Sequence, residues 1–193
     1  MHKVYLFDQY ALLSENLISR ALQFLPADRC TRALQYRRDI DRNNCIVTYL
    51  MLLYGLRECF GIKNFEIALG KYGKPVLSEC PEVHFSIGHC NTGCVVAVAD
   101  RPVGVDIQDV RPVLREVAQR VCSARELEEF DQSQNQDRFF TRIWVAKESY
   151  GKMTGTGVLC ELQNDHSRNA NVSIYVDEGK NYTIGLCIKN SAD

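Results

Sequence analysis

The sequence of 193 residues has almost no net charge, no long apolar run and no cysteine pair spaced to bind zinc. A formal charge of -1 gives no bulk attraction to nucleic acid or to an anionic membrane. The longest apolar run, residues 46–56, has about half the length needed to cross a bilayer. We therefore expect neither nucleic acid nor a membrane among the partners of this protein.

Cysteine and histidine are present in patterns that exclude two kinds of site. The nine cysteines are an odd number, none belongs to a CxxC pair, and the four histidines lack zinc-ligand spacing with them. Cysteines scattered through apparent helices and strands are typical of a reducing compartment. Asp8 interrupts the apolar stretch that a secretory signal would need. We expect a cytoplasmic protein without a signal peptide.

The order of apparent helices and strands predicts the fold class. An apolar content of 46% and a charged content of 24% are typical of a globular protein. No linker, low-complexity tract or strong repeat is visible, and in both halves the strands are grouped after helices. That grouping favours an α+β fold over a regular βαβ winding. The second half begins near Pro102, so we expect an N-terminal unit of residues 1–102 and a C-terminal unit of residues 103–193.

The pattern also predicts where the individual elements lie. Ser14 and Ser123 are expected helix N-caps, the latter in a capping box with Glu126, and Gly155 is an expected helix stop. Helices are expected over residues 14–25, 26–44, 45–61, 113–121, 123–130 and 137–155. Strands are expected over residues 3–7, 64–70, 83–90, 94–100, 103–108, 171–177 and 181–190, with a turn over 71–77.

The last long helix carries a stripe of functional interest. A spacing of four places Phe140, Trp144, Glu148 and Lys152 on one face. We expect the two aromatic rings to anchor this face to the core, with the two charges at its surface end. One interpretation is an ordinary Glu-Lys pair worth about 0.3–0.5 kcal/mol. The other is that Glu148 is a metal ligand.

An acid in the middle of a strand supplies a second candidate ligand. Alternation turns the apolar residues of 103–107 to one face and Asp106 and Gln108 to the other. The carboxylate of Asp106 could be a solvated surface group. It could equally join Glu148 to hold magnesium, which proteins usually bind with one or two carboxylates, waters and substrate phosphates.

Three further motifs are weaker. A turn of Gly73, Lys74 and Pro75 offers a positive charge and backbone N–H groups to a phosphate, although many surface turns look alike. His89 ends a strand beside Gly88, and such a histidine is more often structural than functional. Arginines between the first helices form either a solvated face or a phosphate clamp: Arg29, Arg32, Arg37, Arg38 and Arg42.

Taken in order, these motifs resemble a known family. The sequence reads GKP, then FSIxH, then GVDI, then WxxKESxxKxxGxG between Gly73 and Gly157. This series is similar to that of 4'-phosphopantetheinyl transferases of the larger, monomeric type. Each motif alone is common, but four in this order and spacing are specific.

The resemblance implies an activity, partners and a set of site residues. Such enzymes transfer phosphopantetheine from coenzyme A to a serine of an apo acyl or peptidyl carrier protein and release adenosine 3',5'-bisphosphate. It implies a monomer of two similar α+β halves related by a pseudo-two-fold, with the active site in the cleft between them. The implied magnesium ligands are Asp106 and Glu148, with Gln108 beside them. The implied catalytic residues are Glu148, Lys152 and Asp106, and the implied coenzyme A contacts are Arg38, Gly73, Lys74, Pro75, His89 and Lys152.

The sequence departs from the family pattern at several positions. Gln108 replaces a third acid, so water or its amide oxygen would have to complete the magnesium shell. Gly88 and Cys90 replace serines that often flank the histidine, and the chain is short for the larger type. These departures leave a second hypothesis open, which is a non-catalytic module that binds coenzyme A or a nucleotide phosphate.

Overall fold

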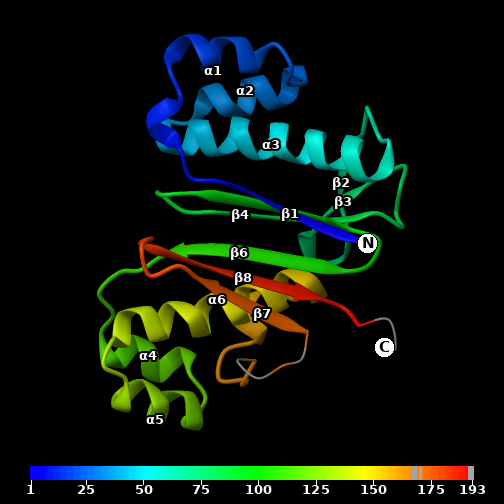
Figure 1. Cartoon of the computed structure of the whole chain (residues 1–193). Helices are drawn as coiled ribbons and strands as arrows, with labels where there is room; N and C mark the ends of the chain where they lie inside the picture. Colours follow the sequence, from blue (N-terminus) through cyan, green and yellow to red (C-terminus); the bar gives the residue numbers. More distant parts are fainter. Residues whose placement is uncertain (167–168, 170, 191–193) are drawn as a thin grey trace.

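In the computed structural model, which describes residues 1–166, 169 and 171–190, two three-stranded sheets lie between two groups of helices (Figure 1). The elements before Pro102 are β1 (His2–Phe7), η1 (Tyr10–Leu12), α1 (Glu15–Leu22), α2 (Ala27–Gln35), α3 (Asp39–Phe60), β2 (Ile67–Leu69), η2 (Lys71–Gly73), β3 (Pro75–Leu77), β4 (His84–His89) and β5 (Cys94–Ala99). Those after it are β6 (Val103–Asp109), α4 (Arg115–Val121), α5 (Ala124–Gln132), α6 (Gln136–Thr154), η3 (Val158–Cys160), β7 (Val172–Val176) and β8 (Tyr182–Ile188).

Both large sheets are antiparallel, and apolar residues of β5 in one sheet pack against β6 and β8 of the other. The first has the order β1-β5-β4 and the second the order β6-β8-β7, while β2 and β3 form a separate hairpin. Between the two sheets the amide of Val105 on β6 donates to the hydroxyl oxygen of Ser86 on β4, over 3.0 Å. The contact brings strands from the two sides of Pro102 together.

Strand β5 explains how the core is built. Its residues Val96 and Val98 pack toward α3, whereas Val95, Ala97 and Ala99 join apolar residues of β6 and β8. Because both faces are covered, all six residues of the strand are buried. A strand buried on both faces needs no alternation of polar residues, which is why the sequence there is continuously apolar.

The expected helix ends are confirmed where capping residues define them. The hydroxyl of Ser14 accepts from the amide of Leu17, and Ser123 and Glu126 form a reciprocal capping box at the start of α5. Gly155 ends α6 in the left-handed conformation at φ 82°. Each of these ends follows from a local hydrogen bond or backbone preference, which the sequence encodes within four residues.

Three sequence expectations are wrong. The helix predicted over residues 26–44 is two helices, because the chain is extended at Tyr36 and Arg38 and α3 begins at Asp39. The turn predicted over 71–77 contains the strand β3, which pairs with β2. Trp144 is not a core anchor, since it is only half-buried and stacks on Phe140 beside a groove.

The mixed helix-and-sheet architecture expected from the sequence is confirmed. The boundary at Pro102, the pseudo-two-fold and the cleft remain predictions. Among the residues that the structure describes, no helix has both the length and the apolar content to span a bilayer.

Candidate functional site

The expected charged residues of β6 and α6 come together beside β4. Lys152 on α6 donates to a carboxylate oxygen of Asp106 over 2.7 Å, and also to the carbonyl oxygens of Ile87 and Val105 at 3.2 Å each. Asp106 is only 7% exposed, so the solvated-carboxylate interpretation is wrong. Lys152 therefore connects the strand before Pro102 to the strand after it.

Glu148 lies one helical turn before Lys152 and does not pair with it. Within residues 1–166, 169 and 171–190, Glu148 forms neither a hydrogen bond nor an ion pair, which rules out the surface Glu-Lys bridge. Burial raises the pKa of Glu148, the charge of Asp106 raises it further, and Lys152 partly offsets both. Two carboxylates thus face each other closely enough to repel, and the one without a partner takes up a proton more readily than usual.

His89, at the end of β4, belongs to the same group of charges. Although part of its ring is exposed, loss of hydration lowers its pKa, and the positive charge of Lys152 lowers it further. The carboxylate of Asp106 acts in the opposite direction. A neutral imidazole at this position can both accept and donate a hydrogen bond.

The glycine-lysine turn forms one wall of a pocket of about 250 Å³. Gly73, Lys74 and Pro75 line it from one side, and Lys152 lines it from α6. Lys74 donates to the carbonyl oxygens of Met153 and Val103, at 2.9 and 3.2 Å. Burial lowers the pKa of Lys74 to about 8. This lysine is thus held between the end of α6 and the start of β6, and it loses its proton more readily than an ordinary lysine.

An adjoining pocket of about 290 Å³ shares Pro75, Phe85 and Ile87 with the first. Its wall includes His89 and two arginines of α2, Arg29 and Arg32. The guanidinium of Arg29 lies 5.5 Å from the ring centroid of Tyr49, and that of Arg32 is hydrogen-bonded to Tyr36. In the described part of the chain neither guanidinium forms a salt bridge with a carboxylate. Both charges are therefore available to an anion.

Arg38, which the sequence leads one to expect as a phosphate contact, lines neither of these two pockets. It precedes the first residue of α3, its side chain is 64% exposed, and one guanidinium nitrogen donates to the side chain of Asn91 over 3.1 Å. Asn91 follows His89 in the turn between β4 and β5. Arg38 is thus a neighbour of this turn, and its role toward a ligand remains a prediction.

Gln108 lines a different groove from the pocket of Lys74 and Lys152. This groove, of about 430 Å³, runs between the end of β6 and α6, and its wall includes Leu114, Phe140 and Trp144. Gln108 is half-buried and lies two residues after Asp106 on β6, so the two side chains share a face of the strand. The groove therefore opens next to the group of charges.

Asp109 cannot replace the missing third acid. It follows Gln108 and so lies on the opposite face of β6. There its carboxylate accepts from the amides of Asn91 and Thr92 at 3.2 and 3.3 Å, and from Arg111 at 2.8 Å. Burial acts to raise the pKa of Asp109, but hydrogen bonds from the side chains of Thr92, Cys90 and Arg111 and from the amide of Asn91 outweigh it and lower the pKa. Asp109 fixes the turn that follows His89, and its oxygens are already occupied.

Close packing explains the glycine at position 88, which the sequence alone did not reveal. A Cβ atom at this position would lie 2.9 Å from the Cα atom of Asp106, closer than real Cβ contacts. The close backbone approach at Gly88 is between β4 and β6. A serine at position 88 would force β6, and Asp106 with it, to move.

The oxygen donors at this junction fit a magnesium ion. Within residues 1–166, 169 and 171–190, no three side chains of His, Cys, Asp or Glu are grouped closely enough to hold a metal ion. Asp106 and Glu148 nevertheless repel each other across β6 and α6, and a cation between them would relieve that repulsion. Magnesium commonly needs only one or two protein carboxylates because substrate phosphates and waters fill the remaining positions.

Sequence reasoning found most of this junction, but it grouped Arg29 and Arg32 with three other arginines and did not single them out. Arg29, Arg32 and Tyr36 are spaced by three and four residues, so they share one face of the chain at α2. That spacing could have separated Arg29 and Arg32 from the other arginines. The carbonyl of Ile87, which holds Lys152, carries no sequence signal at all.

The comparisons with known proteins point to one family. Residues 102–190 match the family model described as the 4'-phosphopantetheinyl transferase superfamily. A curated relative from Bacillus pumilus, "4'-phosphopantetheinyl transferase psf-1", is 28% identical over 155 residues, which cover 78% of this chain and 66% of that protein. A "4'-phosphopantetheinyl transferase" of Bacillus subtilis is 26% identical over 175 residues, covering 86% of this chain and 78% of that protein.

The similarity extends to a yeast protein of the same kind. The "L-aminoadipate-semialdehyde dehydrogenase-phosphopantetheinyl transferase" of Saccharomyces cerevisiae is 29% identical over 165 residues, which cover 78% of this chain and 60% of that protein. The chain thus spans about two thirds of the length of the first of these relatives. The matched regions reach well beyond residues 102–190 and include elements on both sides of Pro102.

Proposed function

We propose that this chain is a member of the 4'-phosphopantetheinyl transferase superfamily and that it moves the phosphopantetheine arm of coenzyme A to a serine of an apo carrier protein. The observation that carries the proposal is the junction of β4, β6 and α6. There a buried Asp106 is bound to Lys152, and an unpaired Glu148 is close enough to be affected by both charges. Neither a helix that serves packing alone nor a surface ion pair explains this arrangement.

The reaction needs a proton acceptor, and Glu148 is the best candidate. The serine hydroxyl of the carrier forms a bond to the phosphorus that bears pantetheine. The bond from that phosphorus to the bridging oxygen of the pyrophosphate breaks, and adenosine 3',5'-bisphosphate leaves with the bridging oxygen and its electron pair. A carboxylate oxygen of Glu148 takes the serine proton, directly or through one water. Its raised pKa makes it a better base than an ordinary glutamate.

Magnesium fits this scheme as the partner of the two carboxylates. Asp106 and Glu148 would hold the ion, with Gln108 as a neutral oxygen donor. Bound there, magnesium would neutralise pyrophosphate oxygens and the charge that develops on the leaving bisphosphate. Lys152 brings a further positive charge to the same centre and is anchored by the carbonyls of Ile87 and Val105.

Coenzyme A would lie along the two adjoining pockets beside β4. The pocket of Gly73, Lys74 and Pro75 also contains Lys152, so it suits the pyrophosphate and the start of the pantetheine arm. The pocket with His89, Arg29 and Arg32 suits the adenosine 3'-phosphate, and Arg38 lies near its edge. Lys74, which lines the same pocket as Lys152, would then contact the pyrophosphate.

The carrier protein would dock over the groove beside Gln108. Leu114 is 71% exposed there, Trp144 offers a half-buried aromatic surface, and Arg111 stands at the rim. An apolar centre with a basic rim suits the acidic recognition helix of a carrier. The groove shares β6 and α6 with Asp106 and Glu148, so a serine delivered from it would arrive beside the proposed base. We further propose that the protein acts as a monomer in the cytoplasm.

The decisive experiment is to incubate the protein with coenzyme A, magnesium and several apo carrier proteins, and to weigh the carriers by mass spectrometry. We expect at least one carrier to gain one phosphopantetheine group, with equimolar release of adenosine 3',5'-bisphosphate. A carrier whose acceptor serine is replaced by alanine is the matched control. If coenzyme A binds without magnesium and no carrier gains mass, the protein is a non-catalytic binding module and the proposal is wrong.

A further inference from the structure

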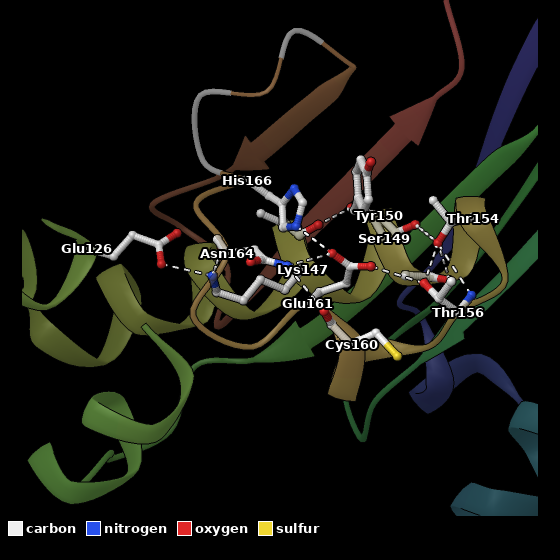
Figure 2. Close-up of polar contacts among 12 residues, drawn as sticks. Glu126, Lys147, Ser149, Tyr150, Thr154, Thr156, Cys160, Glu161, Asn164 and His166 are labelled. Atoms are coloured by element: carbon white, nitrogen blue, oxygen red, sulfur yellow. Dashed lines mark hydrogen bonds and ion pairs between the residues drawn. The ribbon is translucent and has the colours of Figure 1, made fainter. Parts of the chain in front are cut away.

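A second polar cluster lies on the side of α6 that faces away from the second sheet (Figure 2). The opposite side of the helix touches the sheet so closely that a Cβ atom at Gly104 on β6 would overlap the carbonyl oxygen of Ser149. Successive helix residues are rotated by about 100°, so Lys147 belongs to the outer side although it directly precedes Glu148. Yet Lys147 is 0% exposed. Other parts of the chain therefore cover it.

The ammonium group of Lys147 joins three elements of the structure. It donates to a carboxylate oxygen of Glu126 on α5 over 2.9 Å, and to the carbonyl oxygen of Asn164 in the segment after α6. The same oxygen of Glu126 accepts from the amide of Ser123 at the start of α5, over 2.8 Å. Lys147 thus ties α6 to the cap of α5 and to the chain that follows η3 (Figure 2).

The segment after α6 is fastened to the same outer side by a second set of contacts. Glu161 accepts from the hydroxyl of Thr156 over 3.0 Å and is hydrogen-bonded to a ring nitrogen of His166 at 2.7 Å. The imidazole of His166 stacks on the ring of Tyr150, which belongs to α6, with 4.1 Å between centroids. The segment is therefore held at Tyr150 and at Lys147, one turn apart.

Stability alone does not account for a buried lysine at this position. A buried ion pair is commonly no more stabilising than well-packed apolar groups of similar size, because both charges lose their hydration. What it does impose is orientation, since the ammonium must reach both of its partners at once. We infer that Lys147 is a positioning residue: held by Glu126 and Asn164, it fixes the rotation of α6 and so aims Glu148 at Asp106.

The expected effect on kcat rests on the proposed function, whereas the expected effect on the orientation of α6 does not. Trp144 is the single tryptophan of the chain and shares the helix face of Glu148, one turn away. Its fluorescence therefore reports the orientation of that helix face, and the measurement needs neither substrate nor metal. Quenching by acrylamide measures how far the indole is exposed.

The variant to test is the double substitution Glu126→Gln with Lys147→Met, which removes both charges and leaves neither one buried alone. We expect unchanged helix content by circular dichroism and increased quenching of Trp144. In the transfer assay kcat should fall by about 10–100-fold, as is typical when a residue that orients a metal ligand is lost. The KM for coenzyme A should change little, because neither Glu126 nor Lys147 lines either of the two pockets.

A matched control removes another ion pair of the same region. Asp131 on α5 accepts from Arg115 through both carboxylate oxygens, at 2.8 and 2.7 Å, and neither residue contacts α6 through that pair. Asp131→Asn should leave both Trp144 quenching and kcat at the wild-type values. A loss of kcat in this control equal to that of the double variant would mean that any weakening of the helices has the same effect, which would overturn the inference.

Two results for the double variant contradict the positioning role. A folded variant with wild-type quenching and wild-type kcat shows that α6 keeps its orientation without the ion pair of Glu126 and Lys147. A variant that cannot fold shows that the pair serves the stability of the whole domain and not the aim of Glu148. If the wild-type protein transfers nothing, the proposed function fails by itself, while the quenching of Trp144 still decides whether Lys147 sets the helix.

Discussion

Helices α3 and α6 each lie against one of the two three-stranded sheets, but they bury different kinds of residue. Helix α3 buries Ile46, Leu52 and Leu56 completely, and its buried polar side chains are the uncharged Asn44 and Thr48. Helix α6 buries Lys147 and Ser149 just as completely, and its Glu148 and Lys152 reach into the junction with β6. The same position against a sheet thus serves packing in one case and charge placement in the other.

The difference indicates how the two sides of the molecule divide the proposed work. Buried or partly buried ionisable groups with shifted pKa values are concentrated where chemistry takes place, because burying an ionisable group elsewhere destabilises the protein without a functional gain. The side before Pro102 supplies Lys74, His89 and the arginines of α2, which suit binding. The side after it supplies Asp106 and Glu148, which suit proton transfer and metal binding. Substitutions after Pro102 should therefore act mainly on kcat, and those before it on the affinity for coenzyme A.

The largest effect is expected for Glu148→Gln, which should abolish transfer in a folded protein. The amide keeps the size of the side chain, so α6 should form normally. Loss of a catalytic base costs about 10²–10⁴ in rate, and loss of metal stabilisation adds several kcal/mol, roughly, to the barrier. The measurement is carrier mass gain across a magnesium titration, with circular dichroism to confirm folding. Glu128→Gln on the exposed side of α5 is the control and should be fully active.

The pH dependence tests the same residue in the wild-type protein. Glu148 must be deprotonated to accept a proton, and its pKa lies above the ordinary 4.5 because of burial and Asp106. Activity should therefore be lost on acidification at a higher pH than an ordinary glutamate would allow. A folded Glu148→Gln protein that loads carrier at near the wild-type rate, or with the same acidic limb, would remove Glu148 from the mechanism.

The next largest effect is expected on the side before Pro102. Arg32→Ala should raise the KM for coenzyme A by roughly 10–100-fold, the value of one charge-assisted hydrogen bond, and leave kcat nearly unchanged. Dephospho-coenzyme A, which lacks the 3'-phosphate, should bind equally well to the variant and the wild type. Arg20→Ala on the exposed face of α1 is the matched control. Equal losses for both ligands would place the contact of Arg32 on the pyrophosphate.

Arg38→Ala separates the sequence-based expectation from the pocket seen in the structure. The family pattern assigns Arg38 to a phosphate, whereas its guanidinium is exposed and bound to Asn91. If Arg32 holds the 3'-phosphate, Arg38→Ala should weaken coenzyme A binding less than Arg32→Ala does. Isothermal titration calorimetry of the two variants side by side decides between them.

The comparison of α3 and α6 also explains what could be predicted from the sequence. The ends of α1, α5 and α6 are set by local capping residues, so Ser14, Ser123 and Gly155 predicted them correctly. The break between α2 and α3 has no proline or glycine, and tertiary contacts decide it. The same holds at the site, where Asp106 and Lys152 were expected to be functional but their bond to each other crosses 46 residues. Periodicity fixes the face of a strand or helix, but not which faces meet.

A smaller and more specific effect is expected for Lys74. Burial lowers its pKa to about 8, and a phosphate placed beside it would raise the pKa again. Binding of coenzyme A at pH 8 should therefore take up protons, up to about half a proton per site, and binding well below pH 8 should take up fewer at this residue. Calorimetry in two buffers of different ionisation enthalpy measures the uptake. Lys74→Met should abolish it, and uptake that persists in that variant would assign the proton to another group such as His89.

The smallest effect is expected for Gln108→Glu, which restores the acid that the family usually has. Position 108 shares a strand face with Asp106 and is half-buried beside Trp144, so a carboxylate fits the space of the amide. A third negative charge should tighten magnesium binding and lower the magnesium concentration needed for half-maximal rate, with kcat changed only slightly. At magnesium concentrations below saturation the added charge should raise the pKa of Glu148 further and move the acidic limb of the rate profile to higher pH. Magnesium titrations at two pH values measure both shifts. An unchanged magnesium requirement at both pH values would mean that position 108 lies outside the metal shell, and that two carboxylates complete what the protein supplies.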